Sequence, residues 1–383
     1  MIYMYVNDLF NTLKLDRKRK PIPKNIVTKA LKEVDKIKKI PYKTKDWDFH
    51  WGENPYKQYS LIVDLPHIEI TDLKPYKTNI KDKVVFYDEK RIKKEGFKYV
   101  DKSCVITHKG EILIVYITAE FDPAIKKATE RLVPLGEAME KYYPVKASTF
   151  YSAFKITAKT KEEKIQANIT NQALKKKPRY YGKNWMDGQI KYFQGVHNGL
   201  SGTMISYQPR KPDAFQDEQF LYDLVFSYCS LYELEKRYAP AVAKWRLELA
   251  QEAGKVPAIP GVPLDRHPAT GCGASLDFAS AIHNDSGMNG LTETIFWNTP
   301  DKNHKQLFVS PQLKCVFDLT KHNCIILQPP KIPHGTVNSG NHNGYGYVNI
   351  TKQNLVAKTD LNKEWYKKWK NYLSTKAEKD FDE

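Results

Sequence analysis

A His-x-Asp pair followed by a distant histidine is the part of this sequence best suited to chemistry. His283 and Asp285 are two residues apart, and because alternate residues of an extended strand point to the same side, both can reach one metal ion. His334 follows 51 residues after His283 in LQPPKIPHGTVNS, behind a strand-like run at residues 324–327. Two imidazoles and one carboxylate on one face of an iron ion leave three positions open for oxygen and a chelating cosubstrate. The pattern therefore predicts a non-haem iron site, with ordinary surface or core histidines as the alternative.

A second His-x-acid pair offers a competing site. His67 and Glu69 have the same spacing, and His108 follows in a strand-like setting. Their flank, ITDLKPYKTNIKDK, is a charged loop rather than an apolar strand that leads into a pocket. We therefore interpret these residues as exposed polar side chains on a strand edge.

The elements that must position the first site are short strands and amphipathic helices. Between the ligands, TETIFWN, KQLFVSP and CVFDL are strand-like runs separated by turns, as a small antiparallel barrel requires. Hydrophobic spacing predicts further strands at residues 59–70, 83–87 and 105–118, and helices at residues 25–40, 123–143, 217–253 (interrupted at Pro240) and 362–383.

The positive charge lies mostly outside the segment that carries the ligands. The net charge of the chain is +17. Residues 14–46 contain 13 basic and 4 acidic residues, and residues 155–193 contain 10 and 3, whereas residues 256–358 contain 8 and 6. This distribution predicts flanks that bind a polyanion around a near-neutral pocket; a lysine-rich, solvated surface is the alternative.

One basic stretch also contains aromatic residues. KKKPRYYGKNW includes Arg179 and Tyr180, and such a mixture suits a phosphate backbone and an unstacked base, because cations neutralise phosphate and rings stack on bases. His197, in the Gly-rich FQGVHNGLSGT, is a further candidate for phosphate or substrate contact. An ordinary basic loop is the alternative for this region.

Composition indicates a globular chain of 383 residues with 41% hydrophobic residues, which is enough to bury a sizeable core. The five cysteines are widely spread without a CxxC motif, so we expect reduced thiols.

No signal peptide or long apolar run is visible, so we expect an intracellular protein without a membrane association. LDRKRKPIPK predicts a nuclear import signal, with a solvated tail as the alternative.

The stretch GCGASLDFASAIHNDSGMNGLTETIFW together with PPKIPHGT resembles the TET/JBP family of iron-dependent nucleic-acid-base dioxygenases, in particular its divergent fungal, algal and viral branches. The resemblance covers about 100 residues. It implies an α+β fold with a double-stranded β-helix (jelly-roll) core, flipping of a DNA base into the pocket, and oxidation of the 5-methyl group of a pyrimidine. On the matching positions it implies that His283, Asp285 and His334 bind Fe(II) and that Asn289 contacts the flipped base.

The sequence departs from the family where the cosubstrate binds. The family places an arginine on the strand after the distal histidine to pair with the carboxylate of 2-oxoglutarate, and HGTVNSGNHNGYGYVNITK contains none. Lys352 is the nearby cation, and we predict that it contacts the cosubstrate together with Thr336 and Asn349. Arg210 or Arg266 could replace it, or the chain could use ascorbate, as the resembling algal branch does.

These observations predict four segments and one leading function. The segments are an N-terminal α+β part (1–150), a basic, mainly helical part (151–255), the oxygenase core (256–358) and a C-terminal helix (359–383). The function is Fe(II)-dependent oxidation of a methylated pyrimidine, foremost 5-methylcytosine, in DNA, without an obligate protein partner. Two alternatives stay open: a hydroxylase of a protein side chain or small molecule, and a non-catalytic DNA-binding barrel.

Overall fold

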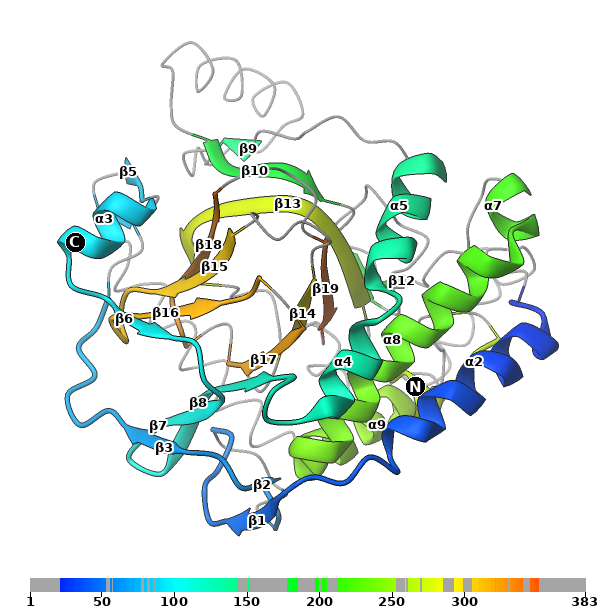
Figure 1. The fold of residues 1–383 in the computed structure, drawn as a ribbon, viewed down its shortest axis with the longest axis horizontal. Coiled ribbons are helices and arrows are strands. Elements are labelled where there is room, and N and C mark those ends of the chain that lie inside the picture. The colour runs from blue at the N-terminus through cyan, green and yellow to red at the C-terminus, as the bar shows by residue number, and fades with distance from the viewer. Residues whose placement is uncertain are drawn as a thin grey trace.

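The chain folds into a mixed α+β structure in a computed structural model (Figure 1). The structure describes residues 21–52, 56, 58–76, 79–80, 83–85, 87–142, 150–151, 178–184, 197–199, 202–204, 212–252, 259, 261–268, 271–284, 293–298, 305–320, 322–328, 331–339 and 345–350. The helices are α2 (Lys24–Ile37), α3 (Glu89–Lys94), α4 (Pro123–Thr129), α5 (Leu132–Tyr142), α7 (Pro212–Gln216), α8 (Glu218–Tyr238), α9 (Pro240–Glu252) and the 3-10 helix η3 (Leu264–Arg266).

The strands divide into an N-terminal group and a C-terminal group. The first group is β1 (Thr44–Trp47), β2 (Leu61–Val63), β3 (His67–Glu69), β4 (Asn79–Ile80), β5 (Lys83–Val84), β6 (Lys98–Val100), β7 (Cys104–His108), β8 (Glu111–Thr118), β9 (Phe150–Tyr151), β10 (Pro178–Asn184), β11 (His197–Gly199) and β12 (Gly202–Met204). The second group is β13 (Gly271–His283), β14 (Glu293–Asn298), β15 (Lys305–Ser310), β16 (Cys315–Asp318), β17 (Asn323–Leu327), β18 (His334–Ser339) and β19 (Tyr345–Ile350).

Most strands join one sheet that bends at β13. In the described residues its order is β3-β7-β8-β17-β14-β19-β13-β18-β15-β16-β6, and β10 and β9 continue from β13. The first half of β13 pairs with β19 and its last residues pair with β18, so β13 belongs to two arms, one on each side of the bend. All pairs among β13–β19 are antiparallel.

Both faces of each arm are covered by apolar side chains, so successive residues of a strand point into different clusters. One cluster lies between the arms, and each arm has a second cluster on its other face. Ile325 and Leu327 of β17 and Phe308 of β15 belong to the inner cluster between the arms. Cys324 and Ile326 face the helices instead. Leu307 and Val309 of β15 face the opposite side, where they pack with Ile92 of α3.

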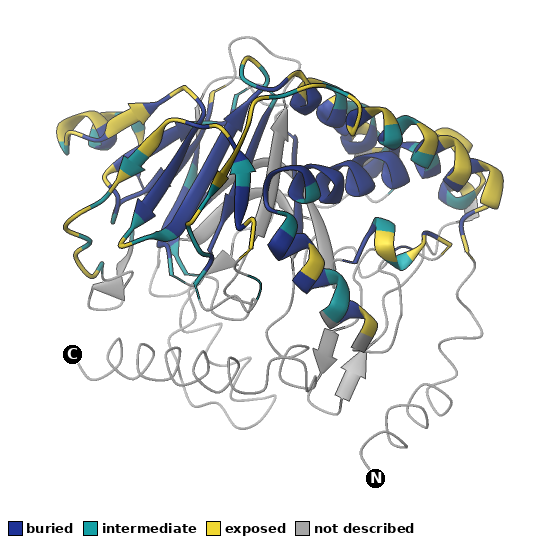
Figure 2. Ribbon diagram, turned by 90° about the horizontal axis from the view of Figure 1, so that it is seen from below, coloured by how far each residue is buried: buried dark blue, intermediate teal, exposed yellow. Residues whose placement is uncertain are grey.

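A layer of helices covers the arm that contains β17, β14 and β19 (Figures 1 and 2). The predicted helices at residues 25–40 and 217–253 are confirmed as α2 and as α8 and α9, which separate at Pro240. The helix predicted at residues 123–143 is wrong in one respect, since it is divided into α4 and α5. Pro134, the third residue of α5, cannot donate a helical hydrogen bond, and its ring would clash with the carbonyl group four residues earlier.

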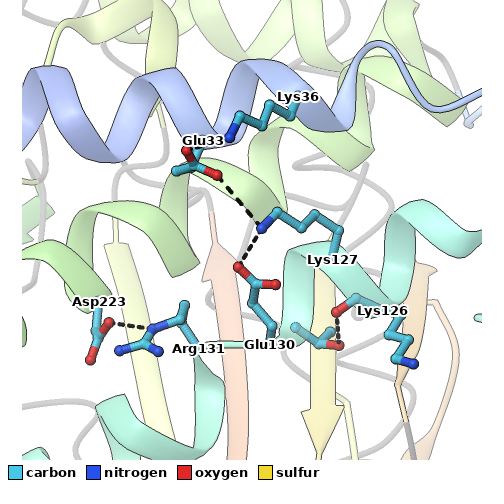
Figure 3. A network of polar contacts seen from close by, with 8 residues as sticks. Glu33, Lys36, Lys126, Lys127, Glu130, Arg131 and Asp223 are labelled. Atoms are coloured by element: carbon cyan, nitrogen blue, oxygen red, sulfur yellow. Dashed lines mark hydrogen bonds and ion pairs between the residues drawn. The ribbon is translucent and has the colours of Figure 1, made fainter.

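Ion pairs connect neighbouring helices (Figure 3). Lys127 of α4 lies 2.7 Å from Glu130 and 3.7 Å from Glu33 of α2. Arg131 donates a 2.6 Å hydrogen bond to Asp223 of α8, and burial still raises the pKa of that carboxyl group. These contacts fix α2, α4 and α8 against one another.

The cysteines and the lengths of the helices can be compared with what the composition predicted. Cys104, Cys229, Cys315 and Cys324 are buried free thiols, as predicted for reduced cysteines. Among the helices described, none combines the length and the apolar content that a membrane span needs.

Gly136 of α5 should tolerate no side chain. A Cβ atom at this position would overlap the ring of Tyr345 on β19, which is only 5% exposed and cannot move outward. We expect Gly136→Ala to destabilise the protein by about 2–3 kcal/mol, measured by urea unfolding, because overpacking forces side chains or backbone to shift. Glu137→Ala, an exposed change in the same helix, should alter stability by less than about 0.5 kcal/mol, and an equally small effect of Gly136→Ala would contradict the packing.

His267 should make the protein sensitive to acid. Burial against α8, with a smaller contribution from Arg246, lowers its pKa to about 3. Because the folded-state pKa lies below the unfolded value of about 6.5, the neutral ring stabilises the fold fully above pH 6.5, and this stabilisation is lost as the pH falls toward 3. We expect unfolding free energies to fall by up to about 1.4 kcal/mol per pH unit in this range from this residue alone. The slope should be smaller in His267→Leu; an unchanged slope would refute the assignment.

Candidate metal centre

His283 and His334 face each other across neighbouring strands. His283 is the last residue of β13 and His334 the first residue of β18, and the two are direct partners in the antiparallel register. Directly opposed residues of an antiparallel pair project to the same face of the sheet. The topology thus brings two residues 51 positions apart to one place.

A β-bulge in β13 sets this register. Ser280 pairs with Thr336 and His283 pairs with His334, so β13 has one more residue than β18 between the two pairs. Without the extra residue, Ser280 and His283 would point to opposite faces, because they are three positions apart. The bulge places both on the face that also carries Thr336.

The two imidazole rings lie as far apart as two rings bound to one metal ion. Their centroids lie 4.6 Å apart with an angle of 52° between the ring planes. A metal–nitrogen bond of about 2.1 Å puts an ion about 3.2 Å from each ring centre, and two such rings at a right angle around it have centres about 4.5 Å apart. The observed centroid separation therefore matches two neighbouring ligand positions of one metal ion.

The orientation of the His334 ring is held on both sides. Its Nδ1 lies 2.8 Å from the carbonyl oxygen of Ile332, and because a carbonyl group can only accept, Nδ1 carries the proton in this contact. Phe308 stacks on the ring with centroids 5.2 Å apart and planes 14° apart. His334 is 4% exposed, so the ring is largely dehydrated, and with the proton on Nδ1 the lone pair of the imidazole is on Nε2.

Two hydroxyl groups lie beside the histidines. The Oγ of Ser280 accepts a 3.0 Å hydrogen bond from the backbone N–H of Thr336 and lies 3.2 Å from its side-chain Oγ1. Thr336 was predicted from the sequence as a cosubstrate contact, whereas Ser280 was not. The sequence could not indicate Ser280, because strict alternation along β13 places it on the face opposite to His283.

Asn349 lies on another face of the sheet. It is two residues from Tyr347 and four from Tyr345 on β19, so it shares their face, and these two tyrosines pack in the helix layer. Its side-chain amide donates a 3.4 Å hydrogen bond to the carbonyl oxygen of Tyr228 on α8. The structure does not bring Asn349 together with His283 and His334.

The arginines whose side chains are described are all bound to carboxylates. Arg266, a predicted substitute for the missing cosubstrate arginine, donates a 2.6 Å hydrogen bond to Asp35 of α2. The other pairs are Arg91–Glu95, Arg131–Asp223, Arg237–Asp122 and Arg246–Glu235. Arg266 therefore belongs to the helix layer rather than to the centre formed by the two histidines.

The basic and aromatic segment contributes a strand beside the centre. Tyr180 of β10 pairs with Ser280 of β13, which pairs on its other edge with Thr336. Arg179 precedes Tyr180 on the same strand. His197 lies on β11 and pairs with Met204 in a separate two-stranded sheet.

Several predicted residues lie outside the described part of the chain. They are Asp285, Asn289, Lys352 and Arg210. Within the described residues no group of three or more His, Cys, Asp or Glu side chains is arranged to hold a metal ion, and the predicted carboxylate ligand is not among them.

The competing His-x-Glu pair is engaged in hydrogen bonds of its own. It lies on β3, the end strand of the main sheet, where the side chains of His67 and Glu69 are 33% and 36% exposed. Thr107 lies 2.6 Å from His67 Nε2 and donates a hydrogen bond to Glu69, which also accepts one from the backbone of Lys109. His108 contacts the carbonyl oxygen of Ile70. These contacts agree with polar residues on a strand edge.

Comparison with known proteins adds one structural likeness. No protein-family model and no curated protein matches the chain. One solved structure that it resembles is NgTET1 in complex with 5mC DNA, with a TM-score of 0.41 and 11% sequence identity, over 71% of this chain and 86% of that one. Because the TM-score is below 0.5, this likeness decides neither fold nor activity.

Proposed function

We propose that this chain is an Fe(II)-dependent dioxygenase that oxidises or otherwise modifies the 5-methyl group of a pyrimidine, foremost 5-methylcytosine, in DNA. The observation that carries the proposal is the pair His283 and His334, opposed across β13 and β18 with ring centres 4.6 Å apart. Asp285, two residues beyond His283, completes the proposed ligand set.

We also propose that β13–β19 form a double-stranded β-helix. The order β17-β14-β19-β13 continues into β13-β18-β15-β16, and the chain crosses between the two arms after β13, β14, β16, β17 and β18. Repeated crossing between two antiparallel arms is the pattern of a jelly roll. In this arrangement β13 carries the first ligand at its end and β18 the last ligand at its start.

In the proposed reaction the protein binds, orients and dehydrates the reacting groups. Ile332 and Phe308 hold the ring of His334, and the hydroxyl groups of Ser280 and Thr336 offer hydrogen bonds to an oxygen atom of the cosubstrate or substrate. Bound ferrous iron would supply oxygen activation. With 2-oxoglutarate, one oxygen atom would enter the methyl C–H bond and the other the keto acid, which would leave as succinate and carbon dioxide.

DNA is the proposed substrate because of charge and strand order. The excess of basic residues lies in residues 14–46 and 155–193. The second of these segments supplies β10, whose Tyr180 is in register with Ser280 beside the histidines. A cationic, aromatic strand next to the two histidines suits a flipped base and its phosphates.

The cosubstrate contact is proposed to come from Lys352 together with Thr336. Arg266 is engaged by Asp35, which favours the lysine over this arginine. A lysine makes a point-charge contact where an arginine makes two parallel hydrogen bonds, so weaker 2-oxoglutarate binding, or use of ascorbate instead, is compatible with the site.

The four sequence segments are proposed to act as one unit in an intracellular, nuclear setting. Residues of the N-terminal part complete the main sheet, since β8 pairs with β17 and β6 pairs with β16. The N-terminal part therefore supports the proposed oxygenase core directly.

The decisive experiment is anaerobic titration with ferrous iron followed by turnover on 5-methylcytosine DNA. 2-Oxoglutarate and ascorbate are supplied separately, and bases are identified by mass spectrometry. We expect one iron per chain and a modified base with one cosubstrate, both lost in His283→Ala. Iron binding without a DNA product would favour the hydroxylase of a protein or small molecule, and the absence of iron binding would favour the non-catalytic barrel.

DNA binding should depend strongly on salt. If several lysines neutralise phosphates, the affinity for a duplex should fall by more than about tenfold between 50 and 200 mM salt, because counterions are released on binding. Fluorescence anisotropy with labelled duplexes measures this slope. An affinity independent of salt would speak against a nucleic-acid substrate.

A further inference from the structure

The turn that leads into His334 is fixed at its first residue. The carbonyl oxygen of Gln328 accepts hydrogen bonds of 3.1 and 3.0 Å from the backbone N–H groups of Lys331 and Ile332. Ile332 in turn offers its carbonyl oxygen to Nδ1 of His334. The carbonyl oxygen that accepts from His334 therefore belongs to a turn that begins at Gln328.

Gln328 is itself bound to the N-terminal part of the chain. It is fully buried, and its Nε2 lies 2.5 Å from the carbonyl oxygen of Ile112 and 3.1 Å from Oε1 of Glu111. Lys331 donates to the same carboxylate oxygen of Glu111. The start of β8 thus holds the turn at two positions.

The end of the turn is held by the inner cluster and by β15. Ile332 is fully buried in that cluster. Ser310 donates a 3.3 Å hydrogen bond to the carbonyl oxygen of Pro333. With both ends held, the carbonyl group of Ile332 has little freedom to rotate away from His334.

We propose that Glu111, Gln328 and Lys331 are positioning residues that fix the tautomer of His334, an inference that rests on the proposed metal centre. With the proton on Nδ1, Nε2 is the ring nitrogen that carries the lone pair needed for a metal bond; a proton on Nε2 instead would remove that lone pair. None of the three residues needs to touch metal or substrate.

The same N-terminal part also supports the other histidine. At the bulge of β13, the backbone N–H of Ile282 donates a 2.8 Å hydrogen bond to the carbonyl oxygen of Val85. Ile282 belongs to the same apolar cluster as Tyr87, Ile92 and Leu307. Residues from before β6 therefore hold the strand immediately before His283.

The test compares the tautomer of His334 with metal affinity in the full-length protein. Gln328→Leu removes both side-chain hydrogen bonds, and Lys331→Met and Lys331→Arg separate loss from retention of the contact with Glu111. Tyr232→Phe is the matched control, because it removes one buried hydrogen bond, to Ala243, in the helix layer. The metal-free proteins are examined by long-range ¹H–¹⁵N spectra of histidine, assigned with His334→Ala, and cobalt(II) is titrated by its absorption.

We expect wild type, Lys331→Arg and Tyr232→Phe to have the proton on Nδ1 and equal cobalt affinity. Gln328→Leu and Lys331→Met should have mixed tautomers and affinities lower by about 10–100-fold. Unchanged tautomer and affinity in both variants would overturn the inference. If the wild type bound neither cobalt nor iron, the proposed function would fail, while the tautomer spectra alone would still decide whether these residues position the ring.

Discussion

We expect His334→Ala to lose stoichiometric ferrous iron binding and all measurable turnover of methylated DNA. The side chain supplies one of two imidazoles whose centres lie 4.6 Å apart, and it is 4% exposed, so its removal takes away a buried nitrogen ligand. Since removal of outer partners of a ligand already lowers metal affinity by about 10–100-fold, loss of the ligand itself should cost more than about 100-fold. Anaerobic iron titration and product analysis measure both effects.

His67→Ala is the matched control for this variant. It removes the histidine of the competing His-x-Glu pair, which lies on an edge strand and is engaged by Thr107. We expect unchanged iron binding and turnover. If His67→Ala lost iron and His334→Ala kept it, the metal centre would have to be moved to β3.

We expect Asp122→Ala to destabilise the fold by about 3–5 kcal/mol, because it leaves a buried guanidinium group without its counter-charge. Asp122 is fully buried and accepts hydrogen bonds of 2.6 Å from Arg237 and from the hydroxyl group of Tyr238. It also caps α4 by accepting from the backbone of Ala124. Urea unfolding at pH 7 measures the loss.

Glu33→Ala is the surface control for this prediction. The contact of Glu33 with Lys36 is also 2.6 Å long, but the lysine side chain is 60% exposed. We expect a loss of less than about 1 kcal/mol, as for other exposed pairs. In Asp122→Ala, adding Arg237→Met should recover part of the stability, since it removes the uncompensated charge; equal losses in Glu33→Ala and Asp122→Ala would refute the role assigned to burial.

Local patterns predicted those elements whose signals lie within a few residues. The amphipathic spacing of residues 25–40 gave α2, and Pro240 marked the boundary between α8 and α9. The short runs between the predicted ligands are the strands β14, β15 and β16. In each of these cases the hydrophobic period or a proline acts on its own neighbours.

Features that depend on distant pairing could not be predicted in this way. Ser280 reaches the face of His283 only because β13 carries a bulge, which β18 imposes from more than 50 residues away. The N–H group of Ile282 finds its acceptor in Val85, and Gln328 finds its partners in Glu111 and Ile112. The sequence around Ile282 and around Gln328 contains no pattern that indicates these partners.

The pairing of β8 with β17 has a consequence for the order in which the chain folds. About 200 residues separate the two strands, and a similar distance separates β6 from its parallel partner β16. Contacts so far apart in sequence slow folding, because a long loop must close before they can form. During synthesis β6 and the edge of β8 that pairs with β17 have no partner strand until β16 and β17 have left the ribosome. Fragments that end before β16 should therefore expose open strand edges and aggregate.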